Sequence, residues 1–222
     1  GLAATQINII TGIQEDTPMF MQDFTRLAPA AAIAALPVTS GLAAGTPVES
    51  AQGWCPVETL HPGMRVQTLD GGLARIVAMD RTWLLPPMQG GVVHLPGGAF
   101  GNCDDLLLLP DQHVLLDLRA DDAAVPGLPD ALAVLIPALA LQGQGGAALR
   151  PQRKPLEVVT LVFAEEELVW AASGLLLHCP GTAQGAGALP GGDTFPRLGE
   201  PAARRLLAAR AAEASALPGW MS

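Results

Sequence analysis

The 222-residue sequence contains no tyrosine, a single lysine (Lys154) and few charged residues of either sign. It has 12 basic residues against 21 acidic ones, a formal net charge of −9, and aromatic residues make up 4% of the chain. An acidic chain does not attract phosphate backbones, and scattered aromatic side chains form no platform on which bases stack. The sequence therefore predicts no nucleic-acid partner.

Long apolar runs are also missing, although half of the residues are hydrophobic. Proline or glycine interrupts each apolar stretch before it reaches the roughly 18 residues that a membrane-spanning helix needs. The high apolar fraction argues against wholesale disorder. We therefore expect a folded protein without a membrane partner, long enough for one sizeable core or two small ones.

Cysteine is scarce, because Cys55, Cys103 and Cys179 are odd in number and lie far apart. This spacing excludes a framework of paired disulfides and contains no C-x-x-C pair. His178 beside Cys179 and His61 near Cys55 would form a zinc site only if the fold brought them together. We predict no metal site and no cofactor.

Residues 1–40 are predicted to be an N-terminal arm, with Ile7–Ile10 as a candidate strand. The Ala-rich stretch after Met21 resembles the apolar part of a signal peptide. However, residues 22–26 have no net positive charge, and Pro29 and Pro37 interrupt the stretch. We therefore interpret it as part of the arm.

From Gly45 onward, short apolar runs alternate with turn residues, a pattern typical of all-β domains. Met64–Leu69 alternates in polarity, Asp70–Gly72 suits the positive φ angles of a tight turn, and Leu73–Met79 returns as a partner strand. A hairpin is therefore predicted here. Further strands are expected at Gly91–Leu95, Leu106–Leu109, Val114–Leu118, Val158–Phe163 and Leu168–Ala171.

Three later segments are less regular. Ala131–Leu141 is apolar, but Pro137 splits it, and its structure stays open. Residues 142–146 predict a flexible turn. Cys179–Gly192 predicts a Gly-rich loop that buries too little surface to become ordered.

The chain after Pro201 is predicted to be helical. Ala202–Ala214 is rich in Ala, Leu and Arg, which are strong helix formers, and proline is tolerated in a first helical turn. The helix would carry a narrow apolar stripe, which more often docks on its own domain than on a partner. The stripe consists of Ala203, Leu206, Leu207 and Ala211.

Several motifs follow one another in an order that resembles a known family. Gly45-Thr46 opens a strand, a glycine turn follows, and the corner Pro56–Leu60 leads into a strand that runs towards Asp70-Gly71. Two later blocks, Asp105–Leu116 and Leu161–Ala171, continue the match. Over roughly residues 41–198 the chain resembles the Hint family, the hedgehog and intein autoprocessing domains, and most closely its bacterial members.

The resemblance implies an all-β horseshoe of two pseudo-symmetric halves with a C-terminal helical tail. It divides the chain into the arm (1–40), a Hint-like β domain (41–198) and a C-terminal helix and tail (199–222). The sequence itself supports two halves, because Leu107–Leu116 and Leu161–Trp170 share one layout of three apolar, four mostly polar and three apolar residues.

In that family a Cys or Ser opens the domain, attacks the preceding carbonyl and converts the peptide into a thioester or ester. The resemblance places this nucleophile at Gly41, which has no side chain. Ser40 lies one residue away and is the candidate nucleophile, although a slip of one residue turns a side chain to the other face of a strand.

The resemblance also assigns His113 to protonate the departing amide nitrogen, which requires it to lie near the backbone of Ser40–Ala44. The hydroxyl residue expected three positions earlier is Pro110, which has no donor. The histidine often found in the last block is replaced by Glu166 or Glu167, depending on the alignment.

The fold motifs are thus present while most catalytic positions are not. The sequence favours a degenerate Hint domain, without self-cleavage or splicing, that acts as a structural or interaction module with a protein partner. Intein-like autoprocessing by an N-to-O/S acyl shift near Ser40 or Gly41 is the alternative. A third class, an enzyme using Asp104–Asp105 and Asp121–Asp122 as general acid and base, is disfavoured because adjacent strand residues face opposite ways.

Overall fold

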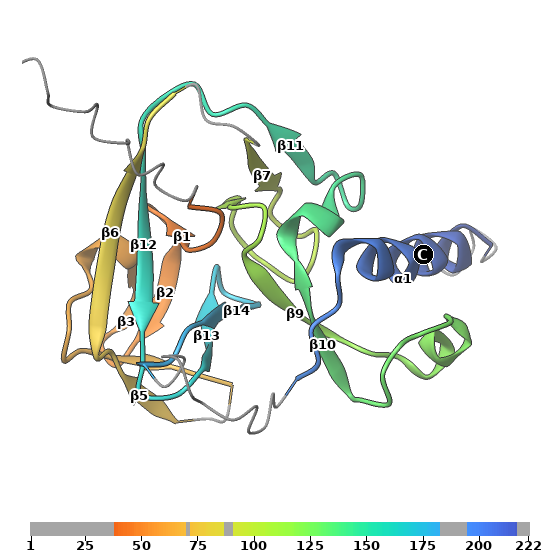
Figure 1. The fold of residues 1–222 in the computed structure, drawn as a ribbon, viewed down its shortest axis with the longest axis horizontal. Coiled ribbons are helices and arrows are strands. Elements are labelled where there is room, and N and C mark those ends of the chain that lie inside the picture. The colour runs from red at the N-terminus through yellow and green to blue at the C-terminus, as the bar shows by residue number, and fades with distance from the viewer. Residues whose placement is uncertain (1–37, 70–71, 87–90, 183–194, 217–222) are drawn as a thin grey trace, which may run out of the picture. The chain divides into compact units, whose positions relative to one another are not determined.

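A computed structural model of the chain describes residues 38–69, 72–86, 91–182 and 195–216. The candidate strand Ile7–Ile10 and most of the predicted arm lie outside these residues. Within them, strands dominate residues 45–175 and the one α-helix is C-terminal (Figure 1). The prediction of an all-β domain with a C-terminal helix is confirmed.

The described elements follow one another in short segments. The strands are β1 (Leu42–Ala43), β2 (Pro47–Ser50), β3 (Gly53–Pro56), β4 (Arg65–Gln67), β5 (Leu73–Arg75), β6 (Ala78–Leu84), β7 (Val92–Leu95), β8 (Leu106–Leu108), β9 (His113–Asp117), β10 (Ala133–Pro137), β11 (Ala148–Arg150), β12 (Leu156–Val162), β13 (Glu167–Ala171) and β14 (Leu175–Cys179). The helix α1 spans Glu200–Ala216, and 3₁₀ turns lie at Val57–Thr59, Ala120–Ala124 and Ala138–Leu141.

These strands form two antiparallel sheets. The six-stranded sheet has the order β11-β7-β8-β1-β12-β6, and the eight-stranded sheet has the order β10-β9-β14-β13-β2-β4-β5 with β3 paired to β2. The chain passes from the six-stranded to the eight-stranded sheet between β1 and β2, between β8 and β9 and between β12 and β13, and it returns between β5 and β6 and between β10 and β11. The chain thus alternates between the two sheets along its length.

Burial explains why β10 and β14 are so apolar. All five residues of β10 are buried, as are four of five in β14, because both faces of these strands are covered. β6 at the end of its sheet is largely exposed. The main core joins both sheets and includes Ile136, Leu161, Phe163 and Leu177.

The predicted hairpin is confirmed, since β4 and β5 pair with Val66 opposite Ala74. The returning strand is shorter than predicted. The Ile76 N–H still bonds to Met64, but the Val77 N–H donates to the Val162 carbonyl at 2.8 Å. The chain therefore changes sheets at this point, and β6 begins as a separate strand.

The observed strand pairing also decides the structure of two other segments. Ala131–Leu141 divides at Pro137 into β10 and a 3₁₀ turn. The predicted loop Cys179–Gly192 is wrong at its start, because Cys179 ends β14 and Gly181 bridges to Phe163, and residues 183–192 of it lie outside the described residues. The apolar β14 inserts between β13 and β9, which buries surface that the local sequence could not assign.

Helix α1 docks on the domain as predicted. Ala203, Leu206 and Leu207 are buried in the main core, whereas Ala211 is exposed, so that the stripe is one turn shorter than expected. Beside Ala211, Arg210 contacts Asp122. No helix in the described part of the chain is long and apolar enough to cross a membrane.

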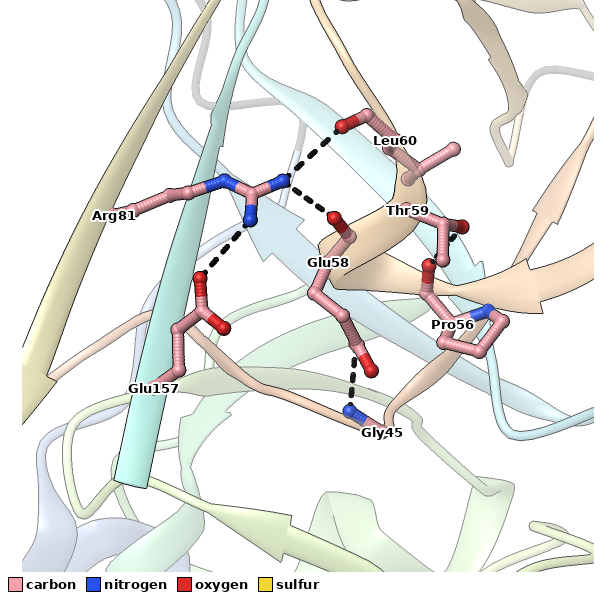
Figure 2. Close-up of polar contacts among 7 residues, drawn as sticks. All are labelled: Gly45, Pro56, Glu58, Thr59, Leu60, Arg81 and Glu157. Atoms are coloured by element: carbon pink, nitrogen blue, oxygen red, sulfur yellow. Dashed lines mark hydrogen bonds and ion pairs between the residues drawn. The ribbon is translucent and has the colours of Figure 1, made fainter. Parts of the chain in front are cut away.

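The corner that carries the family resemblance fixes the start of the domain (Figure 2). The carboxylate of Glu58 accepts the Gly45 N–H at 2.8 Å. The Arg81 guanidinium donates to the carbonyls of Glu58 and Leu60 and pairs with Glu157 at 3.0 Å. The corner thus connects the β1–β2 turn to β6 and β12.

Candidate functional site

A pocket of about 280 Å³ lies where the chain enters β1. Ser40 and Gly41 line it together with His113 at the start of β9, His178 near the end of β14, and Arg197. The passage from β8 to β9 supplies part of its wall, and strands β12 and β14 supply further parts together with Arg197. The expected proximity of His113 to the backbone at Ser40–Ala44 is confirmed.

Gln112 links the elements of this site. Its side chain is 2% exposed, its Oε1 accepts the Gly41 N–H at 2.9 Å, and its Nε2 donates to the carbonyls of His113 and His178 at 3.1 and 2.9 Å. One buried amide therefore holds β1, β9 and β14 together at the pocket, with donors and acceptor satisfied.

Gly41 occupies a space that excludes a side chain. Its φ is +121°, a backbone conformation that residues with a Cβ rarely adopt, and a Cβ built there would lie 2.6 Å from Val158 Cγ1 and 3.2 Å from Thr160 Oγ1. The position at which the family resemblance expects a nucleophile is therefore shaped around glycine.

Ser40, the candidate nucleophile one residue earlier, is exposed at the pocket rim. The carbonyl of Thr39, which a Ser40 hydroxyl would attack, accepts the Asp111 N–H at 2.8 Å. This hydrogen bond polarises the Thr39 carbonyl.

The two histidines face each other edge-on, with ring centroids 6.3 Å apart. Burial and then the nearby Arg197 lower the pKa of His113 below its usual value, and the same two causes lower the pKa of His178. Both imidazoles are therefore neutral at neutral pH. A neutral imidazole has no surplus proton to give to a departing amide nitrogen.

Arg197 and Glu166 set the hydrogen bonding of His178. Arg197 Nη2 donates to Glu166 Oε1 at 2.8 Å and lies 3.1 Å from His178 Nε2. A guanidinium cannot accept, so in this contact Nε2 is the acceptor. Of the two glutamates proposed to replace the family's last histidine, Glu166 is the one in contact with His178, at 3.4 Å, while Glu167 lies in β13 opposite Cys179.

Cys179 borders the pocket but is not a nucleophile. Burial raises the pKa of its thiol to about 12, so that it holds almost no thiolate at neutral pH. Within the described ranges no three His, Cys, Asp or Glu side chains gather closely enough to hold a metal ion. The zinc site considered for His178 and Cys179 is thus not assembled there.

The carboxylate pairs have structural partners. Asp105 accepts the Gly97 N–H at 2.8 Å and contacts His94, and these hydrogen bonds lower its pKa. Asp122 is buried against Arg210, while Asp121 is exposed. Neither pair faces the pocket.

The sequence missed the roles of Gln112 and Arg197. Gln112 stands in the segment that carries the family resemblance, but no local pattern marks its two long-range hydrogen bonds, to Gly41 and to His178. Arg197 follows the Gly-rich stretch, and it reaches the site because residues 196–198 bond to Leu135 of β10. Its guanidinium is therefore positioned by tertiary pairing.

Comparisons with solved structures find intein relatives of low identity. A bacterial intein-like domain from Clostridium thermocellum is 16% identical, covers 63% of this chain and 98% of its own, and superposes with a TM-score of 0.44. The MchDnaB-1 intein is 14% identical, covers 61% of this chain and 98% of its own, and has a TM-score of 0.36. Among curated proteins, none matches the chain.

The family model described as the Hint domain matches residues 40–176, more than half of the chain. The match begins at Ser40, on the rim of the pocket, and ends within β14. This chain belongs to the Hint domain family.

Proposed function

We propose that this chain is a Hint domain that does not cleave or splice itself, and that it acts as a structural or interaction module for a protein partner. The observation that carries the proposal is Gly41. A cysteine or serine in its place would have to adopt a positive φ and displace Val158. A nucleophile is therefore absent where the family resemblance expects it, and the local packing has no room for one.

The hydrogen bonds at the scissile position support the same proposal. An acyl shift at the Ser40–Gly41 bond needs a proton delivered to the Gly41 nitrogen as the bond breaks. In this chain that nitrogen donates to Gln112 Oε1, which is an acceptor and carries no proton. His113 and His178 are neutral, and Pro110 supplies no hydroxyl.

The charge of the chain narrows the class of partner. A net charge of −9 opposes binding to phosphate backbones, and large apolar side chains such as Trp54, Trp83 and Leu132 are exposed. Exposed aromatic and aliphatic side chains favour contact with another protein.

The test is the intact mass of the full chain after incubation with dithiothreitol or hydroxylamine. We expect a single species at 22.8 kDa throughout, because no ester or thioester forms for these nucleophiles to attack. Release of residues 1–39 or 1–40 would contradict the proposal.

One observation favours a second function, self-cleavage before Ser40. Asp111 polarises the Thr39 carbonyl, and Ser40 is exposed beside it. The Ser40 Oγ–C bond would form as the Thr39–Ser40 C–N bond breaks, the hydroxyl proton would pass to the nitrogen, and water would hydrolyse the ester. Release of residues 1–39 by the parent chain but not by Ser40→Ala would establish it.

A further inference from the structure

The outer edge of β6 offers seven residues of strand with no described neighbour on that side. β6 ends the six-stranded sheet, and among the described residues it pairs with β12 alone. Five of its seven residues are exposed. In Figure 1, β6 lies to the left of β12.

The register shows which residues present their backbone groups to this edge. The Ala44 N–H donates to Glu157, so Glu157 faces β1 and its neighbour Val158 faces β6. Val158 lies opposite Thr82. Since backbone groups alternate along a strand, Thr82 faces β12, and Arg81 and Trp83 direct their N–H and C=O groups outward.

Unpaired edges of this length are unusual unless charge or proline blocks them. Arg81 is the basic residue of β6, and its guanidinium is drawn inward to Glu157 and to the carbonyls of the corner (Figure 2). Trp83 and the following Leu85 remain exposed at 61% and 67%. Asp80 is also exposed in this strand, so the edge carries one acidic side chain beside these apolar ones, and its outward backbone groups are available for hydrogen bonding.

We propose that a second copy of this chain pairs with it, β6 against β6 in antiparallel register, with Thr82 opposite Thr82 of the second copy. This register sets Trp83 across from the Arg81 of the other copy and Leu85 across from its Met79. A tryptophan beside an arginine side chain and paired apolar residues are favourable cross-strand neighbours. The register with Arg81 opposite Arg81 sets like charges together and is unfavourable.

The strength of this contact follows from its size and charge. One strand from each copy forms an interface below the roughly 1,200 Å² of standard complexes, so the dimer is weak and depends on concentration. Each chain carries a net charge of −9, and salt that screens this repulsion strengthens the association. The inference goes beyond the proposed function and holds whether or not the chain cleaves itself.

Sedimentation equilibrium of the full chain tests whether two copies associate through the β6 edge. We expect the weight-average mass to rise from 22.8 kDa towards twice that value with concentration, and to rise further in 0.5 M than in 0.05 M salt. Trp83→Lys should stay at 22.8 kDa at every concentration. Leu132→Lys is the matched control, because Leu132 is 89% exposed away from β6, and it should behave like the parent.

Disulfide cross-linking tests the register. In the proposed pairing, Thr82 and its symmetry mate form a pair without mutual hydrogen bonds, with Cα atoms about 4.5 Å apart. Two Thr82→Cys thiols lose two protons and two electrons to oxidised glutathione and form a dimer bridge. Asp80→Cys is the control, since its symmetry mate lies four residues along the paired strand and out of reach.

A parent chain that stays monomeric at all concentrations and salt conditions overturns the inference. A dimer that persists in Trp83→Lys would show that β6 does not form the interface. Cross-linking of Asp80→Cys as efficient as that of Thr82→Cys would show that the proposed register is wrong. Circular dichroism of each variant, compared with the parent, separates loss of pairing from loss of fold.

Discussion

At the scale of single residues, Gly41 shows how the site differs from a working nucleophile position. We predict that Gly41→Ala lowers the free energy of unfolding by roughly 2–4 kcal/mol, because the new Cβ adds both a positive-φ penalty and crowding against Val158. Urea denaturation followed by circular dichroism measures the loss.

Gly45 provides the matched control for that substitution. It also has a positive φ, +89°, but nothing lies within 4 Å of a Cβ built on it. Gly45→Ala should therefore cost only the backbone strain, about 1 kcal/mol. Val158→Ala should relieve part of the Gly41→Ala loss, and strictly additive effects of the two changes would show that crowding is not the cause.

His178 provides a second residue-scale prediction. Burial and the Arg197 charge lower its pKa, while Glu166 raises it. Arg197→Ala removes one lowering influence and leaves Glu166 free to accept from a protonated ring. We expect the pKa of His178 to rise in this variant, as measured by NMR titration of the imidazole, with Arg205→Ala as a control that leaves it unchanged.

An unchanged or lowered pKa of His178 in Arg197→Ala would mean that Arg197 does not control the protonation of the ring.

The shifted pKa of His178 also makes the stability of the fold depend on pH. Because the folded pKa of His178 lies below the unfolded value, protonation opposes folding, and stability from this group is lost as the pH falls through the unfolded value near 6.5. The rise in pKa should therefore reduce the acid sensitivity of the variant.

At the scale of elements, a nearly buried ion pair fastens α1 to the sheet. Arg210 donates to Asp122 at 2.9 Å, and the side chains are 11% and 3% exposed. We predict that Arg210→Ala lowers the free energy of unfolding by roughly 3 kcal/mol, because it leaves a buried carboxylate without its partner. Urea denaturation of the two proteins at pH 7 measures the difference.

The exposed Arg205 of the same helix is the control, and Arg205→Ala should change the stability by less than about 0.5 kcal/mol. Hydrogen bonds from Arg210 lower the pKa of Asp122. Its contribution is therefore present above the unfolded pKa near 3.9 and is lost as the pH falls through the folded value. If the Arg210→Ala difference fails to shrink below about pH 3, the carboxylate is not its source.

Many elements follow from local sequence, and two of the exceptions depend on tertiary contacts. The β4–β5 hairpin, β7, β8, β9, β12, β13 and α1 were predicted from alternation, turn residues or helix propensity. β14 was not, because Leu175–Cys179 is short and continuously apolar, and only its place between β9 and β13 makes it a strand. Ala211 was misassigned because an ion pair takes the place of apolar docking at the end of α1.

At the scale of the whole molecule, the order of motifs predicted which segments meet, but it could not predict what holds them. Ser40, Gly41 and His113 were placed together by the family resemblance, and they line one pocket. Two hydrogen bonds of Gln112 join residues 71 and 66 positions apart, and the Arg197–Glu166–His178 contacts join residues 12 to 31 positions apart. Such contacts leave no periodic signal in the sequence.

The last prediction concerns the site as a unit, since nucleophile, hydroxyl and histidine contribute non-additively in acyl chemistry. Gly41→Cys alone supplies a thiol with a pKa near 8.5 and only a few per cent thiolate, in a space that Val158 occupies. We expect no thiol-dependent release of residues 1–40 from this variant. Adding Val158→Ala makes room, and adding Pro110→Thr restores a donor, so release should become measurable by intact mass in the triple variant.

His113→Ala in that triple background is the control. It should slow release, because His113 lines the pocket beside Gly41 and is the residue to which the family resemblance assigns proton transfer to the Gly41 nitrogen, and the parent triple variant should release faster at lower pH, where more of His113 is protonated. Cleavage by Gly41→Cys alone would show that the glycine is the sole defect. Release that His113→Ala does not slow would show instead that the proton comes from solvent, and that the pocket contributes position but no acid.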